Sequence, residues 1–137
     1  MFETTFRNFR EQMKVRRAFH EARRMACELL EPHGLTPPRY EVLRALEDTS
    51  APADTPGQLA RKIGVSPSSM SRLLQALERE GFVASAREPA DRRQVRLSVT
   101  EEGRARFLRA RERFESADMT AAGEQLRLAI EGTRSLV

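Results

Sequence analysis

Two helix-start signals stand eleven residues apart in the middle of this chain of 137 residues, and they constrain its fold more than any other feature. Each signal is a hydroxyl-bearing residue followed by proline, first Thr55-Pro56 and then Ser66-Pro67. A hydroxyl at the N-cap and proline at the first helical position both favour the start of a helix. A glycine then marks the end of each segment. The pattern predicts a helix over 56–63 and another over 67–80, joined by a turn of about three residues, which is the spacing of a helix-turn-helix motif.

Two further helices are predicted before this motif. Residues 4–31 contain no glycine or proline, and their apolar residues recur at helical spacing on more than one face. Such a pattern predicts a long helix that packs against two partners. A second helix is predicted from its N-cap, Thr36, to about Asp48. Its expected buried stripe is Tyr40, Leu43 and Leu46, with Val42 beside it.

After the motif, the apolar pattern changes to a period of two. Every second residue is apolar in two short segments, with Phe82, Ala84 and Ala86 in the first and Val95, Leu97 and Val99 in the second. This period predicts two strands that each bury one face. The loop EPADRR between them combines a proline turn with charged residues, so its tip is expected to face solvent. A two-stranded hairpin directly after a helix-turn-helix motif makes a winged helix-turn-helix.

Two more helices are predicted at the end of the chain. Thr100, followed by two glutamates, is expected to cap a helix that carries Phe107, Leu108 and Phe114. After a break near 118–120, a short helix carries Leu126, Leu128, Ala129 and Ile130.

These elements predict a single domain over residues 1–137 that is mainly α with a small β-hairpin. A winged helix-turn-helix core over 36–100 is flanked by helices at 1–31 and 101–137. A chain of this length builds one core, and its 39% hydrophobic and 32% charged residues exclude collagen-like and disordered classes.

The formal net charge of +4 is concentrated in the predicted winged helix-turn-helix. Residues 55–100 hold eight basic and four acidic residues, whereas residues 1–54 hold nine of each and residues 101–137 hold seven of each. A basic surface between neutral segments is the electrostatic pattern expected of a protein that binds a polyanion.

Several other classes of protein are excluded. No apolar run approaches the ~20 residues that cross a bilayer, and charges stand where a signal peptide needs an apolar block, so we expect a cytoplasmic protein without membrane contact. The single cysteine, Cys27, excludes an internal disulfide and a multi-thiolate metal site. The sequence has no glycine-rich phosphate loop and no HExxH or CxxC motif, so we expect no enzymatic activity, cofactor or metal.

The second helix of the motif has two chemically different faces. At about 100° per residue, one stripe is apolar and consists of Met70, Leu73, Leu74 and Leu77. The opposite stripe is polar and consists of Ser68, Arg72, Gln75 and Arg79. Any surface helix shows polar residues outward, but here a basic hairpin stands beside it and favours contact with double-stranded DNA.

The residue types on this polar stripe suit both parts of a DNA surface. Arginine and glutamine form bidentate hydrogen bonds with guanine and adenine edges in the major groove. Short serine side chains let the helix N-terminus approach phosphates, which its exposed N–H groups favour. The predicted DNA contacts on this helix are Ser66, Ser68, Ser69, Ser71, Arg72 and Gln75, and Gln58 is added from the preceding helix.

The hairpin loop adds a second group of candidates. Arg92 and Arg93 lie at its tip, and Arg87 and Arg96 lie nearby. Taken by itself the loop is equally well an ordinary solvated turn. Beside a helix-turn-helix it is placed to reach an adjacent minor groove, whose narrow A·T-rich stretches attract arginine. The predicted DNA contacts are Arg87, Arg92 and Arg93, with Asp91 holding Arg93 in place.

Three segments make the chain resemble the MarR family of bacterial winged-helix transcription regulators over essentially its whole length. They are PHGLTPPRYEVLRAL, QLARKIGVSPSSMSRLLQALEREGFV and DRRQVRLSVTEEG, in the family's order. The last is the most specific, because it joins an Asp-x-Arg wing to a capping threonine and Glu-x-Gly. The resemblance implies that Asp91 and Arg93 are the wing pair, that 66–80 is the recognition helix and that the terminal helices form a homodimer. Where the family commonly has an acidic residue and then arginine, this chain has Ala84 and Ser85.

The phenylalanines independently favour a homodimer. Six of the seven lie in the terminal helices: Phe2, Phe6, Phe9, Phe19, Phe107 and Phe114. They carry more apolar surface than a winged-helix core covers alone, so we expect intertwined terminal helices from two chains to bury them. A two-fold dimer places its recognition helices in successive major grooves, about 34 Å apart, and predicts a pseudo-palindromic operator. Steric blockage of a promoter, and so repression, is the expected mechanism.

The control of such a regulator stays open between alternatives. Many members of the resembled family release DNA when a small aromatic or phenolic effector binds. The equivalent crevice would be lined by Met13, Arg16, Arg17, His20 and Tyr40, although core packing and surface ion pairs explain these residues as well.

Two further alternatives concern Cys27 and the fold itself. Cys27 is either a redox sensor, with Arg23 and Arg24 favouring its thiolate, or a buried structural thiol. A winged helix also serves in some proteins as a protein-interaction module without specific DNA binding. Such a module would show an apolar patch where Ser68, Arg72 and Gln75 stand.

Overall fold

The computed structural model describes residues 2–48, 55–87, 89–91, 95–117 and 120–134. The order of elements is the predicted one: helix, helix, helix-turn-helix, hairpin, helix, helix. The elements are α1 (Phe2–Leu30), the short 3-10 helix η1 (Glu31–His33), α2 (Pro37–Glu47), α3 (Pro56–Ile63), α4 (Pro67–Arg79), β1 (Val83–Arg87), β2 (Val95–Val99), α5 (Glu101–Ser116) and α6 (Thr120–Arg134).

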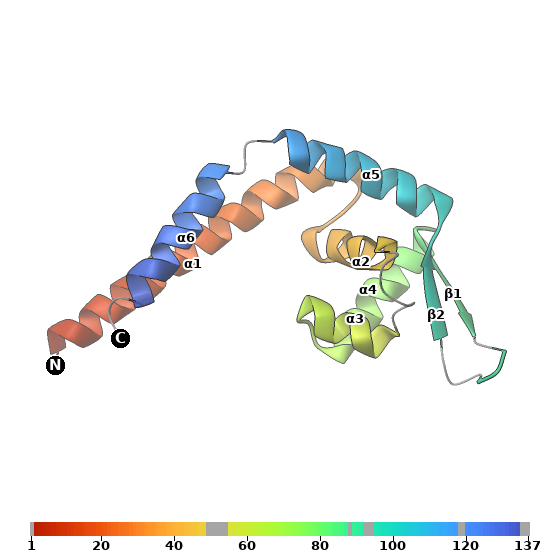
Figure 1. Cartoon of the computed structure of the whole chain (residues 1–137), viewed down its shortest axis with the longest axis horizontal. Coiled ribbons are helices and arrows are strands. Elements are labelled where there is room, and N and C mark those ends of the chain that lie inside the picture. The colour runs from red at the N-terminus through yellow and green to blue at the C-terminus, as the bar shows by residue number, and fades with distance from the viewer. Residues whose placement is uncertain (1, 49–54, 88, 92–94, 118–119, 135–137) are drawn as a thin grey trace.

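The described chain forms a lobe and an arm (Figure 1). The lobe consists of α2, α3, α4, the β1–β2 hairpin and α5, which packs on α2. The arm consists of α6 and of α1 up to about residue 21, which lie side by side and extend away from the lobe. Of the helices in the described ranges, none has the length and apolar character needed to span a membrane.

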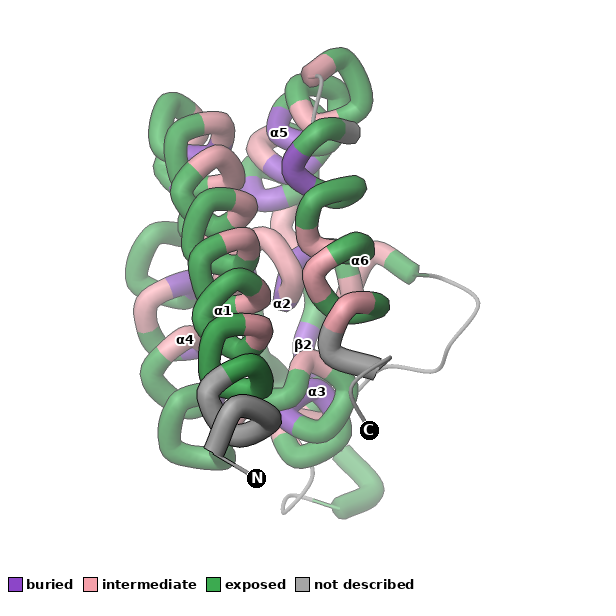
Figure 2. Tube along the Cα trace, turned by 90° about the vertical axis from the view of Figure 1, so that its left-hand side faces the viewer, coloured by how far each residue is buried: buried purple, intermediate pink, exposed green. Residues whose placement is uncertain are grey.

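One continuous apolar core holds the lobe together (Figure 2). Its six largest fully buried side chains come from four helices: Leu30, Val42, Leu43, Leu59, Met70 and Leu77. Burying a side chain of this size contributes about 1.5–3 kcal/mol. Because α1 supplies Leu30 and α4 supplies Met70 and Leu77, the last turn of α1, from which the arm extends, and the polar stripe of α4 are fixed to the same core.

Each predicted N-cap inside the lobe is confirmed. The hydroxyl oxygens of Thr36, Ser66 and Thr100 accept hydrogen bonds from backbone N–H groups three residues later. Thr55 forms a full capping box, because Gln58 N–H donates to its hydroxyl at 3.3 Å and Gln58 Oε1 accepts from the Thr55 N–H at 2.9 Å. Caps of this kind contribute about 1 kcal/mol each, and they set where the helices of the lobe begin.

The hairpin is antiparallel, with a register that runs from Val83 opposite Val99 to Arg87 opposite Val95. The alternation expected for β2 is confirmed, because Leu97 is buried between exposed neighbours. Of the residues expected to be buried at the first strand, Phe82 is buried, but the expectation is wrong for Ala84 and Ala86, which are exposed while Val83 is buried. The physical reason is the register: Val83 and Ser85 lie opposite Val99 and Leu97 and share their inward face, so Ala84 and Ala86 lie on the other, solvent-facing side of the hairpin.

The expectation that the terminal-helix phenylalanines need a second chain is wrong for two of them. Phe107 is only 3% exposed, and Phe114 is partly buried against the core of the same lobe. The apolar stripe of α5 lies over α2, where both rings contact Tyr40, so one chain covers them. Phe9 and Phe19 of the arm are more than half exposed, at 58% and 54%. The side chains of Phe2 and Phe6 lie outside the described part.

Candidate DNA-binding surface

The two faces predicted for α4 are both present. Met70, Leu74 and Leu77 are buried in the lobe core, and Leu73 packs beside them. Ser68, Arg72, Gln75 and Arg79 are exposed, and we call these four residues the reading face. The core side of the helix therefore fixes its position, while its outer side keeps two bidentate hydrogen-bonding groups, Arg72 and Gln75, available to a partner.

The start of α4 is built from hydroxyl groups without an acidic residue in its first turn. Ser66 Oγ accepts from the Ser69 N–H at 3.1 Å and donates to Ser69 Oγ at 3.0 Å. Ser66 Oγ and Ser68 Oγ lie 3.2 Å apart. Because Ser66 is occupied as the cap, Ser68 and Ser71 are the serines whose hydroxyls can turn outward. A helix N-terminus of this composition favours an anion such as a phosphate.

Two grooves flank α4. One, of about 370 Å³, separates it from the start of α2 and has Arg39 and Arg72 on its rim. The other, of about 230 Å³, lies between α4, the start of α3 and the hairpin, and it includes Ser71 and Gln75. A ridge between two grooves is the shape that a helix needs in order to enter a major groove.

The remaining predicted contacts are placed around this ridge. Gln58 is exposed on α3, but its amide oxygen is used in the capping box, so its first role is to start that helix. Arg87 ends β1 and is exposed, and Asp91 and Arg96 are exposed on the loop and on β2. Arg92 and Arg93 lie outside the described residues, and so does the predicted pairing of Arg93 with Asp91.

An ion pair that the sequence did not point to holds the surface in place. Arg39 Nη1 of α2 lies 2.8 Å from Glu80 Oε1, just after the end of α4. The partners are 41 residues apart in sequence, and no local pattern brings them together. A second long-range pair joins Arg104 of α5 to Glu47 of α2 at 3.0 Å. Both pairs are partly exposed, so each contributes about 1 kcal/mol or less and serves to orient helices.

The residues of the predicted effector crevice lie in two different environments. The Tyr40 ring packs on Phe107 and Phe114, with centroids 5.3 Å and 5.1 Å away. Burial in this aromatic cluster, followed by the charge of Glu41, raises the pKa of Tyr40. Arg17 instead lines an open groove of about 530 Å³ between α1 and α6. Met13, Arg16 and His20 are exposed on α1, so in the single chain Tyr40 belongs to the lobe and the other four to the arm.

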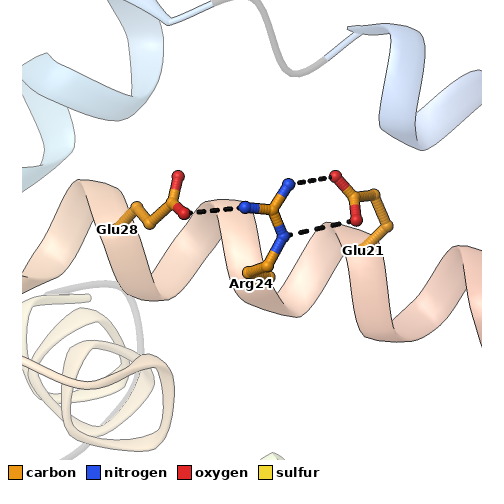
Figure 3. A network of polar contacts seen from close by, with 3 residues as sticks. All are labelled: Glu21, Arg24 and Glu28. Atoms are coloured by element: carbon orange, nitrogen blue, oxygen red, sulfur yellow. Dashed lines mark hydrogen bonds and ion pairs between the residues drawn. The ribbon is translucent and has the colours of Figure 1, made fainter.

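Cys27 is exposed, so the expectation of a buried structural thiol is wrong for the single chain. Its neighbours Met25 and Ala26 are partly buried, whereas Cys27 and Glu28 are exposed. Arg24, which was expected to favour the thiolate, is held by two carboxylates (Figure 3). Its Nη2 lies 2.5 Å from Glu21 and its Nη1 lies 2.8 Å from Glu28. The hydrogen bond and charge of Arg24 lower the pKa of Glu21, and the two carboxylates balance the cation near Cys27.

The surface carries no cluster of three metal-ligating side chains in the part of the chain that the structure describes. A helix-turn-helix whose second helix exposes bidentate groups, followed by a hairpin, defines the winged helix-turn-helix class of proteins. A family model described as MarR family matches residues 33–94. The match covers less than half of the chain, so the chain is similar to the MarR family over its winged helix-turn-helix.

Two curated relatives of Bacillus subtilis (strain 168) are similar to part of the chain. The HTH-type transcriptional repressor YetL is 32% identical over 74 residues, which cover 54% of this chain and 44% of YetL. The HTH-type transcriptional repressor MdtR is 27% identical over 96 residues, which cover 70% of this chain and 61% of MdtR. The matches thus span less than two thirds of either relative. Both are regulators of transcription and not enzymes.

A solved structure of the same class supports the fold in detail. The transcriptional repressor CouR, bound to a 23-mer DNA duplex, has a TM-score of 0.69 and 28% sequence identity. The similarity covers 74% of this chain and 70% of that chain.

Proposed function

We propose that this protein is a transcriptional repressor that binds double-stranded DNA in a sequence-specific manner. The observation that carries the proposal is the reading face of α4, which pairs exposed Arg72 and Gln75 with an acid-free, hydroxyl-rich N-terminus. The first feature suits base edges and the second suits phosphates, so the helix has both parts of a sequence-reading surface. CouR, which is similar in structure, is bound to a 23-mer DNA duplex in its solved structure.

The proposal includes a homodimer formed through the arm. Five apolar side chains are exposed on the arm: Phe9, Met13, Phe19, Leu128 and Ile130. An apolar surface of this kind on a folded chain is typical of a protein–protein interface. Because an isologous dimer repeats its reading face about a two-fold axis, the operator would be pseudo-palindromic, with half-sites about 34 Å apart.

Control by a small aromatic or phenolic effector is the regulatory part of the proposal. Its support is the partly buried Tyr40 ring beside two phenylalanine rings, with the Arg111 guanidinium 5.8 Å from the centroid of the Phe107 ring. An aromatic cluster near a cation suits a ligand that carries both a ring and an acidic group. Titration with benzoate should then release the operator duplex, and an unchanged complex at saturating benzoate would count against this chemistry.

The decisive experiment is selection of genomic fragments by the purified protein, beside the double variant Arg72→Ala, Arg93→Ala. Recovery of a discrete pseudo-palindrome by the wild type alone is the expected result. Recovery of no enriched sequence would refute specific DNA binding and favour a winged helix that works through protein partners. Arg93 is included in the double variant because the sequence pattern of the hairpin loop predicts that it contacts DNA.

The single variant Arg72→Ala is expected to relax sequence preference at one or two base positions. The expected loss of discrimination is about 1–3 kcal/mol per position, the range for a bidentate contact to a base edge. Competition between the operator and its single-base variants measures it. Arg109→Ala on α5 removes the same charge from another helix and serves as the control. Equal discrimination by wild type and Arg72→Ala would show that Arg72 does not read a base.

A further inference from the structure

A carboxylate stands beside the reading face. Glu78 is exposed on α4 and lies in the groove of about 230 Å³ between α4, α3 and the hairpin. It follows Gln75 by three residues and Ser71 by seven, so the three side chains share one edge of the helix. Ser85 of β1 lines the opposite side of this groove. An acidic group therefore lies on the surface that we propose meets a polyanion.

The charge of Glu78 is not neutralised within the described chain. Three other glutamates of the lobe face cations: Glu41 with Arg44 at 2.6 Å, Glu47 with Arg104 at 3.0 Å and Glu80 with Arg39 at 2.8 Å. Among the described residues, Glu78 has no ion pair and its carboxylate accepts no hydrogen bond. Across the groove, Ser85 offers a neutral side chain that is too short to act as a counter-ion.

We infer that Glu78 is a specificity-determining residue that excludes non-operator DNA through its uncompensated negative charge. The inference rests on the proposed function, because it concerns the same surface. Non-specific binding depends on attraction to phosphates, and a carboxylate at the edge of the contact surface opposes it. A like charge placed against the wrong partner is a recognised route to specificity.

The operator complex and the non-operator complex differ in the hydrogen-bond donors that lie next to the Glu78 carboxylate. When α4 is seated on its own sequence, base edges lie next to the helix, and an exocyclic amino group of cytosine can donate to a glutamate. On other sequences the carboxylate meets phosphates without such a donor. Glu78 therefore weakens the non-operator complex more than the operator complex, and the ratio of the two affinities rises.

The test compares the wild type with Glu78→Gln on a 25-base-pair operator duplex and on a shuffled duplex of equal composition, at two salt concentrations. Glu78→Gln is expected to tighten binding to the shuffled duplex by about two- to fivefold, the size of one exposed charge interaction, and to change operator binding less. The difference should shrink at high salt, because ions screen exposed charges. A thermal melt checks that the fold is unchanged.

Two further variants test whether the effect comes from the charge of residue 78 and not from its side-chain shape, and whether it depends on the position of that charge. Glu78→Asp keeps the charge and is expected to keep the wild-type ratio of affinities. Glu112→Gln removes one charge from α5, on the opposite side of the lobe from α3 (Figure 1), and is expected to leave the ratio unchanged.

Three outcomes overturn the inference. The first is an unchanged ratio in Glu78→Gln, the second is an equal change in Glu112→Gln, and the third is a fall in ratio that comes wholly from weaker operator binding. A wild type that binds both duplexes alike would instead refute the proposed function, so the two failures are distinguishable.

Discussion

Replacing Gly103 with alanine is expected to destabilise the lobe by about 3 kcal/mol or more, at the upper end of the range for overpacking a closed site. A β-carbon added at Gly103 would lie 2.1 Å from the carbonyl oxygen of Phe82 and 2.8 Å from its carbonyl carbon. Both atoms belong to the backbone, so no side-chain rotation can make room. The first turn of α5 and the start of the hairpin would have to separate.

This separation would break a junction that several other bonds hold together. The Thr100 N–H donates to the Phe82 carbonyl at 3.0 Å, and the Gly103 N–H donates to the Thr100 hydroxyl at 3.0 Å. Urea unfolding followed by circular dichroism measures the loss. Gly57→Ala is the matched control, because a β-carbon there meets nothing within 4 Å. Equal unfolding midpoints for Gly103→Ala and the wild type would contradict the close approach of the two backbones.

Phe107→Ala is the second variant with a large expected effect, a loss of about 3–5 kcal/mol in the free energy of unfolding. Phe107 is 3% exposed, and its ring packs on Tyr40, so truncation leaves a cavity in the lobe core. The loss should not depend on protein concentration, because the contacts that are removed lie within one chain.

Phe19→Ala is the matched control for this variant. Phe19 is 54% exposed on α1, so its truncation should leave the unfolding of a monomer nearly unchanged and lower the dimerisation affinity instead. Analytical ultracentrifugation over a range of concentrations separates the two effects. If Phe107→Ala altered only the dimer affinity, Phe107 would belong to an interface and not to the core.

Local signals made the lobe predictable from the sequence. A cap followed by proline acts on the next turn of helix alone, so Thr55 and Ser66 fixed the starts of α3 and α4 within a residue. The apolar stripe of α4 is equally local, and its buried members Met70 and Leu77 were predicted with it.

The errors arose where the outcome depends on which surface an element meets. Alternation along β1 says which side chains share a face, but it does not say which face lies on the core, and here it is the face of Val83 and not that of Ala84. Similarly, Phe107 lies on the apolar stripe of α5 whether that stripe covers its own lobe or a second chain, so the spacing could not tell the two apart. The pair of Arg39 and Glu80 was missed because its members stand far apart in sequence and each looks like ordinary surface charge.

The Thr100 hydroxyl has a consequence for how movement would pass through the molecule. It accepts from the Gly103 N–H at the start of α5 and donates to the Gly81 carbonyl, just beyond the end of α4. One oxygen atom thus clamps the helix that leads to the arm onto the helix that carries the reading face. While both hydrogen bonds of the Thr100 hydroxyl are formed, we expect α4 and the first turn of α5 to move together. In a dimer the distance between the two reading faces would then be set where α5 meets the arm, far from the DNA.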